Sequence, residues 1–302
     1  MTRRPRSRLP PKLPDPARDH VPSPPKGPTI GDRLKREHVA GRSTRFGRDE
    51  IVGIMRRLTI GAPSTRLGLA PFDSLPLTHV EAAVAATYGW TGDGPRARIA
   101  PKRTVAGFTA ACERILEVAH GGGSIAFATA RPASLHHLYR ALATAADEAG
   151  ATVLAADETV PLGPSGQRLW WIDRVAVLTD HSSLLGHDSI DAAREMLFAL
   201  PRPDLVVADR MFAGVAVAGG TEVVAFADLD AVALAVAAWQ GRAVRVVPLD
   251  DRRPPSAYLP LVELLGEIAA TPAVAPMPGG ASPNGLPESP PAAVDRESRT
   301  AP

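Results

Sequence analysis

Polar side chains stand directly after five apolar segments of strand length in the second half of the chain. These side chains are Thr129, Asp180, Asp209, Asp228 and the pair Asp250-Asp251. The carboxyl ends of parallel strands meet at one edge of a sheet, where open α/β proteins bind their ligands. A single aspartate at such an edge can simply cap the next helix, but several carboxylates together repel each other unless a cation lies among them.

We therefore predict that Asp180, Asp209 and Asp228 hold a divalent metal ion, Mg²⁺ or Mn²⁺, because such ions prefer carboxylate oxygens. The ion would bind a phosphate group, and Asp180 and Asp209 would also act in catalysis. His187, in the segment HDSID, is the candidate proton carrier, with His181 as the alternative. A lone histidine is more often merely packed or solvated, and the sequence contains no compact metal motif such as HExxH.

The segment Thr129-Ala-Arg-Pro-Ala-Ser134 follows the first of these strands and opens a helical pattern. A strand-to-helix turn directs backbone N–H groups and the positive end of the helix dipole at an anion. We expect Thr129, Arg131 and Ser134 to bind the phosphate, although a plain helix cap would look similar. The turn is not a P-loop, and the sequence contains neither a GxSxG elbow nor a GxGxxG segment after a strand.

The elements around these residues predict an α/β fold. From residue 121 to about 270, short apolar segments alternate with helical patterns, which indicates a Rossmann-like, mostly parallel sheet flanked by helices. Residues 29–120 read as an N-terminal helical layer, in which Thr78 and Glu81 form a capping box. Trp170 and Trp171 are predicted on one strand, with one ring buried and the other partly exposed.

Composition divides the chain into a single domain, residues 29–270, and two tails. Residues 1–28 and 271–302 are rich in proline and lack apolar periodicity, so both tails should be disordered and dispensable for stability. Cys112 is the single cysteine, which excludes a disulfide framework or a multi-cysteine zinc site and is expected to be a buried thiol.

Charge is unevenly spread along the sequence. Residues 1–50 contain 13 lysines and arginines against six acidic residues, a net charge of +7 that leaves −5 on the remainder. A basic arm on a slightly acidic body does not indicate a specific nucleic-acid-binding domain, although the arm alone would suit an interaction protein. No segment approaches the roughly 20 apolar residues of a membrane helix, and no apolar secretory segment follows the basic start, so we expect a cytoplasmic protein.

Several segments together resemble a family of bacterial, mostly actinobacterial, phosphatases. The resemblance covers residues 35–268 and is carried by SIAFATARPASLHHL, AVLTDHSSLLGHD, RPDLVVADRMFAG, VVAFADLDAVAL and VVPLDD. The family shows an ATGHP-type turn, a TDGG or SDGG turn with a downstream HTH, PDLVVADHGWAG, GFADCNDPAL and VPLDD. Matching positions are Thr129, Pro132, Asp180, His187, Asp209, Ala213, Gly214, Asp228, Leu249, Asp250 and Asp251.

The chain departs from the family at several polar positions. The departures are Ala130-Arg131 for Gly-His, His181-Ser182 for Gly-Gly, Arg210 for His and Asp230-Ala231 for Asn-Asp. Arginine still binds phosphate, but it cannot act as a base at neutral pH.

The resemblance implies a metal-assisted phosphatase, a phosphoric monoester hydrolase acting on a small phosphorylated metabolite. The alternative is a non-catalytic phospho-ligand-binding or regulatory protein on the same fold. Convergence of at least two of the three predicted metal-binding carboxylates would favour the enzyme.

Overall fold

The computed structural model describes residues 27–72, 75–163, 166–180 and 183–271. His181 and nearly all residues of the two tails lie outside these ranges. The disorder expected of the tails and the catalytic role considered for His181 therefore stay predictions.

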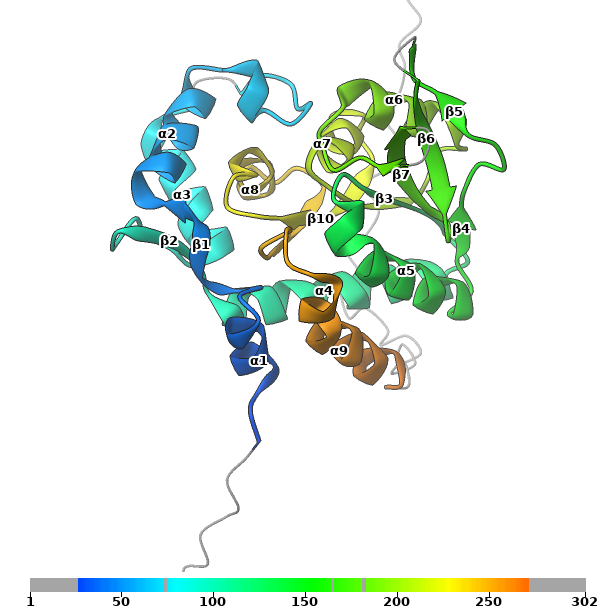
Figure 1. Ribbon diagram of the computed structural model, residues 1–302, viewed down its shortest axis with the longest axis horizontal. Coiled ribbons are helices and arrows are strands. Elements are labelled where there is room, and N and C mark those ends of the chain that lie inside the picture. The colour runs from blue at the N-terminus through cyan, green and yellow to red at the C-terminus, as the bar shows by residue number, and fades with distance from the viewer. Residues whose placement is uncertain (1–26, 73–74, 164–165, 181–182, 272–302) are drawn as a thin grey trace, which may run out of the picture.

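One mixed sheet of nine strands, counted within the described residues, forms the centre of the protein (Figure 1). Its order is β11-β10-β9-β3-β7-β6-β5, with β4 beside β3 and β8 beside β7. Strands β6 and β8 pair antiparallel with β7, and β5 with β6, whereas the other pairings are parallel. The strands of this sheet are β3 (Ser124–Thr129), β4 (Thr152–Leu154), β5 (Val160–Pro161), β6 (Gln167–Ile172), β7 (Val175–Asp180), β8 (Ser183–Leu184), β9 (Leu205–Asp209), β10 (Glu222–Ala227) and β11 (Val244–Pro248).

The α/β class is confirmed, but the sheet is mixed, and the Rossmann-like assignment stays a prediction. The mixture has a local cause at Asp173 and Arg174. Both residues have positive φ values, 49° and 66°, which form the tight two-residue turn that returns β6 into β7. Strand β6 must therefore run antiparallel to β7.

The order of the parallel strands places a topological switch point between β3 and β9. The chain goes from β3 to β7 on one side, and then crosses to β9 on the other side before continuing to β10 and β11. In open α/β folds, the carboxyl ends of the strands at such a switch point are where ligands bind.

Helices cover both faces of the sheet. Helices α1, α4, α5 and α9 pack together on one face, and α6, α7 and α8 line the other, with α2 and α3 packed against α8 (Figure 1). The helices are α1 (Ile30–Arg36), α2 (Arg48–Thr59), α3 (Leu77–Tyr88), α4 (Pro101–His120), α5 (Pro132–Glu148), α6 (Ile190–Ala199), α7 (Arg210–Ala218), α8 (Val232–Trp239) and α9 (Leu259–Ala269), with short 3-10 helices at Pro63–Thr65 and Pro255–Tyr258.

The N-terminal layer is not wholly helical, contrary to the prediction. Strands β1 (Gly41–Gly47) and β2 (Arg96–Ile99) form an antiparallel ribbon whose members lie about fifty residues apart in the chain. The predicted capping box at Thr78 is also wrong. Helix α3 already begins at Leu77, directly after Pro76, so Thr78 lies inside its first turn.

Two local predictions are confirmed. On β6, Trp170 is 49% exposed and Trp171 only 8%, as expected for successive strand residues. Cys112 is fully buried in α4, and burial raises the pKa of its thiol to about 12. None of the helices within the described ranges is long and apolar enough to cross a bilayer.

Candidate active site

Three buried aspartates meet at the carboxyl edge of the sheet and form an acidic cluster. Carboxylate oxygens of Asp228, Asp250 and Asp251 lie within 4.8 Å of one another. Asp228 follows β10, where its Oδ1 accepts from the backbone N–H of Leu229 (2.7 Å) and its backbone carbonyl accepts from the Tyr88 hydroxyl of α3 (2.8 Å). The N-terminal layer thus reaches directly into the cluster.

Arg45 of β1 brings a cation to the acidic cluster from the N-terminal ribbon. Its Nη1 lies 2.7 Å from Asp228 Oδ2 and 3.3 Å from Asp251 Oδ1. Asp250 takes its own partner, because its Oδ2 accepts from Arg253 Nε (2.9 Å) and Nη2 (2.6 Å). Asp251 is also within 4 Å of the guanidinium nitrogens of Arg131, Arg210 and Arg252. The acidic cluster therefore lies inside a ring of arginines.

Arg210 is held in a strained conformation beside the cluster. It opens α7 with a φ of 48°, a left-handed conformation that costs a non-glycine residue about 1–2 kcal/mol. Its guanidinium donates to both oxygens of Asp188 (2.9 and 3.0 Å from Nε) and to Asp230 Oδ1 (2.8 Å). Backbone strain at a buried, fully engaged arginine is typical of a functional site.

The switch point itself holds Thr129, Asp209 and Arg131. The Thr129 hydroxyl donates to Asp209 Oδ2 (2.5 Å), and the backbone N–H of Ala130 donates to Asp209 Oδ1 (2.8 Å). The Arg131 side chain turns back over the loop, where Nη1 donates to the carbonyls of Ala130 (2.8 Å) and Gly186 (3.1 Å). Asp209 thus ties the loop after β3 to the end of β9.

Burial and like charge shift the acidities of these groups. Burial, reinforced by the neighbouring acids, raises the pKa values of Asp228 and Asp251. Burial raises the pKa of Asp209 to about 7 despite its two hydrogen-bond donors, which act in the opposite direction. The pKa of Arg131 is lowered by burial and by the positive charge of Arg210.

Two buried polar atoms at the centre of this network have no hydrogen-bond partner among the described residues. They are Asp251 Oδ2 and Arg131 Nε, which lie 3.7 Å apart. Arg210 Nη1 also lies 3.6 Å from Asp251 Oδ2, beyond hydrogen-bond distance. Unpaired buried groups are costly, so a donor and an acceptor left facing each other here indicate a place built for a small polar ligand.

The structure brings together only some of the predicted site residues. Thr129, Arg131 and Asp209 meet at the switch point, whereas Asp228 belongs to the acidic cluster with two aspartates that were not predicted to bind metal. This cluster contains only one of the three predicted metal-binding carboxylates, so the predicted convergence of two of them is not met there. Asp180 is exposed at the end of β7, at the side of the sheet where β8 pairs.

The remaining predicted residues lie near the edge of the network. Ser134 is half-buried in the first turn of α5, where its N–H donates to the carbonyl of Arg131 (3.0 Å). His187 is exposed, but the next residue, Asp188, binds Arg210.

Arg45 and Asp188 were missed by sequence reasoning. Arg45 lies 183 residues from Asp228 in the chain, and no local pattern marks it. Asp188 could have been found, because it adjoins His187 within the segment HDSID that already resembled the family motif.

The Ala213-Gly214 pair of the family motif has a packing role behind the site. A Cβ on Gly214 would lie 1.7 Å from the carbonyl oxygen of Leu67, so only glycine lets α7 approach the loop before α3. Leu67 itself has a φ of 51°, which shows how tightly this loop is folded onto the helix.

Comparison with known proteins agrees with the motif resemblance. The chain is 30% identical over 241 residues to Phosphatase SCO2771 of Streptomyces coelicolor, a match that covers 76% of this chain and 91% of that relative. The family model described as Phosphatase matches residues 27–271, which include β1, the acidic cluster and the switch point. The chain therefore belongs to the Phosphatase family.

Proposed function

We propose that this protein hydrolyses a small phosphomonoester at the carboxyl edge of the sheet, with a divalent metal ion held by the acidic cluster. The observation that carries the proposal is the pair of unpartnered buried atoms, Asp251 Oδ2 and Arg131 Nε, between three carboxylates and three arginines. A phosphate would supply an acceptor for Arg131 Nε, and a metal ion would bind Asp251 Oδ2.

The donor set of the acidic cluster fits Mg²⁺ or Mn²⁺. All three residues, Asp228, Asp250 and Asp251, are buried and offer hard oxygen ligands. Burial, together with neighbouring acids, raises the pKa values of Asp228 and Asp251, and a bound cation would stabilise their ionised forms. An ion bound there would polarise a phosphoryl oxygen and stabilise the charge that develops during hydrolysis.

Arginines supply the anion-binding part of the proposed mechanism. Arg131 stands at the switch point and keeps Nε free of any hydrogen bond within the described chain, so it can turn one donor toward a phosphate oxygen. Arg45 keeps about a quarter of its side chain exposed, as does Asp188, so a substrate would enter between them. Ser134 and the turn after Thr129 would line the same entrance.

Proton transfer is assigned to Asp209, with His187 as the alternative. Burial brings the pKa of Asp209 to about 7, so this carboxyl can exchange a proton near neutral pH. The Thr129 hydroxyl donates a hydrogen bond to Asp209 and accepts one from the backbone N–H of Arg131 (2.9 Å). Thr129 thus couples the acid to the turn that would face the substrate.

A panel of phosphomonoesters tests the proposal. Purified protein would be assayed for phosphate release with Mg²⁺, with Mn²⁺ and with a chelator. We expect release from at least one small substrate with metal and its loss with chelator. Release that is unaffected by chelator would contradict the metal-assisted mechanism, and no release from any substrate would contradict the enzyme assignment.

Non-catalytic binding of a phosphorylated ligand is the second candidate, and one observation favours it. Arg210 replaces a histidine of the family motif and is fully engaged with Asp188 and Asp230, so it cannot move a proton. Calorimetric titration with a substrate analogue separates the two candidates. Tight binding without turnover of any substrate in the panel would favour the binding protein.

A small phosphorylated metabolite in the cytoplasm remains the proposed substrate class and location.

A further inference from the structure

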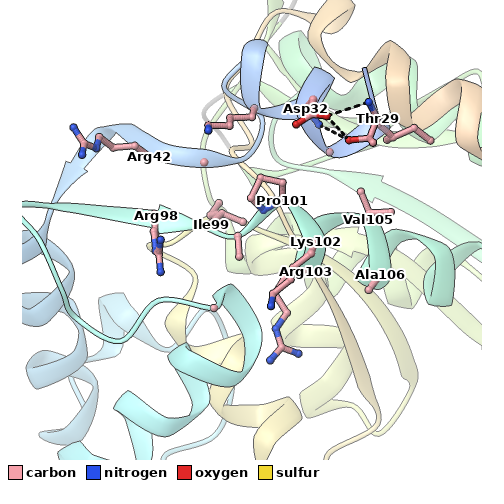
Figure 2. Close-up of a pocket in the computed structure, with 16 residues that line it drawn as sticks. Thr29, Asp32, Arg42, Arg98, Ile99, Pro101, Lys102, Arg103, Val105 and Ala106 are labelled. Carbon is pink, nitrogen blue, oxygen red and sulfur yellow. Dashed lines mark hydrogen bonds between the residues drawn. The ribbon is translucent and has the colours of Figure 1, made fainter. Parts of the chain in front are cut away.

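A second cationic region lies away from the acidic cluster, between α1, the β1/β2 ribbon and the start of α4. It is a cavity of about 1190 Å³, which we call the basic pocket (Figure 2). Five of its lining side chains are cationic, namely Lys35, Arg42, Arg98, Lys102 and Arg103. A cavity of this size holds a nucleotide-sized ligand.

These five cations have no ion-pair partner in the part of the chain that the structure describes. Asp32 is the single acidic residue of the lining, and its carboxylate is taken up by Thr29, whose N–H (3.1 Å) and hydroxyl (2.7 Å) both donate to it (Figure 2). Asp32 keeps its negative charge, so it offsets one of the five cations and the lining retains a net positive charge.

The register of the ribbon adds to this charge. Arg42 on β1 stands directly opposite Arg98 on β2, a cross-strand like-charge pair that destabilises an antiparallel ribbon. The first turn of α4 lines the same cavity, so the positive end of the helix dipole lies there, although the N–H groups of Arg103 and Thr104 already donate to the Ala100 carbonyl. An anion in the pocket would relieve both features at once.

Figure 2 shows the side chains of Arg42, Arg98 and Arg103 spread around the cavity instead of meeting at one point. Separate cations suit a ligand whose phosphates are spaced along its length, whereas a single phosphate would require donors that converge. The floor is apolar, with Ile99 buried and Ile30 and Val105 half-buried. None of the lining residues is aromatic, so the pocket lacks a platform on which nucleic-acid bases would stack.

The basic pocket is also separate from the candidate active site. Arg45 of β1 reaches Asp228, while Arg42, three residues earlier on the same strand, lines the pocket. Residues 27–120 contain 14 lysines and arginines against nine acidic residues, whereas residues 121–271 contain 11 against 18. The pocket therefore belongs to the basic N-terminal part of the chain, and the acidic cluster to the acidic C-terminal part.

We propose that the basic pocket is a second anion site, which binds a small molecule carrying two or more phosphate groups, of about the size of a nucleoside triphosphate. This inference does not depend on the proposed phosphatase activity, because the pocket shares no residue with the acidic cluster or the switch point.

Calorimetric titration of the full chain tests the proposal, with chelator present so that no metal-dependent turnover occurs. The probes are inorganic tripolyphosphate, ADP and inorganic phosphate. We expect tripolyphosphate and ADP to bind at least tenfold more tightly than phosphate, with affinity falling as salt rises. Equal affinities for the three probes would overturn the proposal.

Variants locate the binding. The double variant Arg42→Gln with Arg98→Gln should weaken tripolyphosphate binding at least tenfold, whereas Arg56→Gln, an exposed arginine of α2 outside the pocket, should leave it unchanged. Asp228→Asn should also leave it unchanged. Full-strength binding by the double variant, or its loss in Asp228→Asn, would show that the ligand binds elsewhere.

Two further measurements test whether the arginines are structural and whether the ligand is a nucleic acid. The unliganded double variant should melt no lower than the wild type, because two like charges have been removed, and a much lower melting temperature would show that these arginines are structural. A single-stranded oligonucleotide that binds more tightly than tripolyphosphate, and loses affinity in the double variant, would overturn the small-molecule assignment in favour of nucleic acid.

Discussion

The two cationic regions of this protein use arginine in opposite ways. At the active-site edge, Arg131 and Arg210 are buried, and Arg210 is clamped between carboxylates. In the basic pocket, Arg42 and Arg98 are exposed, occupy opposite positions in the ribbon register and form no ion pair within the described ranges. The arginines at the carboxyl edge of the sheet are held by acidic residues of the protein itself. The arginines of the basic pocket are not, which is why we propose that they bind a ligand.

The largest expected difference between the regions is in stability. Replacing Arg210→Ala would remove the hydrogen-bonded cation of Asp188 and the one cation that Asp230 has within the described residues. Breaking a buried ion pair costs about 3–5 kcal/mol, which corresponds to roughly 6–20 °C in a domain of this size. Arg98→Gln, an exposed change, should stay within about 0.5 kcal/mol of the wild type.

Thermal melting of the two variants side by side checks this prediction. Equal melting temperatures for both would show that the buried network contributes nothing that the exposed one lacks. Arg210→Lys keeps a charge and serves if the alanine variant does not fold.

A smaller effect should appear in the pH dependence of stability. The pKa of Asp209 is raised from an ordinary value of 3.8 to about 7, so the folded protein keeps a proton that the unfolded chain releases. This stabilisation is complete below about pH 4 and is lost as the pH rises to about 7. The metal-free protein should therefore melt several degrees lower at pH 8 than at pH 5.

Asp209→Asn sharpens that measurement, because the amide can accept from Ala130 and donate to Thr129 without ionising. Its melting temperature should vary less with pH, while the exposed control Asp157→Asn should follow the wild type. A wild-type melting temperature that climbs from pH 5 to pH 8 would contradict the assignment.

The smallest effect concerns the ribbon. Arg98→Gln removes one of two opposed like charges, so it should raise stability by about 0.2–0.5 kcal/mol at low salt. The gain should vanish in high salt, because exposed charges are screened. Chemical denaturation at two salt concentrations measures it, with Arg56→Gln as the matched control. A gain that persists at high salt would have another cause.

Sequence reasoning succeeded where the signal was local. The apolar segments that became β3, β7, β9, β10 and β11 were recognised as strands, but their order was not predicted, so the contact between Thr129 and Asp209 was not foreseen. It failed where partners lie far apart in the chain. Arg45 reaches Asp228 only through the β1/β2 ribbon, whose strands are too short and too distant in sequence to predict. Thr78 was misread as the N-cap because the helix begins one residue earlier, at Leu77, with Pro76 as its N-cap.

The acidic cluster shows the same limit. The sequence identifies each aspartate as a strand-end residue but does not determine which carboxylates converge. Asp209 turns toward Thr129 and Ala130, while Asp228 turns toward Asp250 and Asp251. Strand register sets this difference, because Asp209 pairs with Phe226 and Asp228 lies two residues further on.

The most direct test of the central claim is phosphate release by Asp228→Asn, measured together with the shift in melting temperature that Mn²⁺ produces. A ligand stabilises a protein only through binding its folded state, so loss of the metal site must remove both signals. The account predicts that Mn²⁺ raises the melting temperature of the wild type and of Asp157→Asn, and that Asp228→Asn loses this shift and its hydrolysis while remaining folded. Hydrolysis and a Mn²⁺ shift that both survive in Asp228→Asn would contradict it.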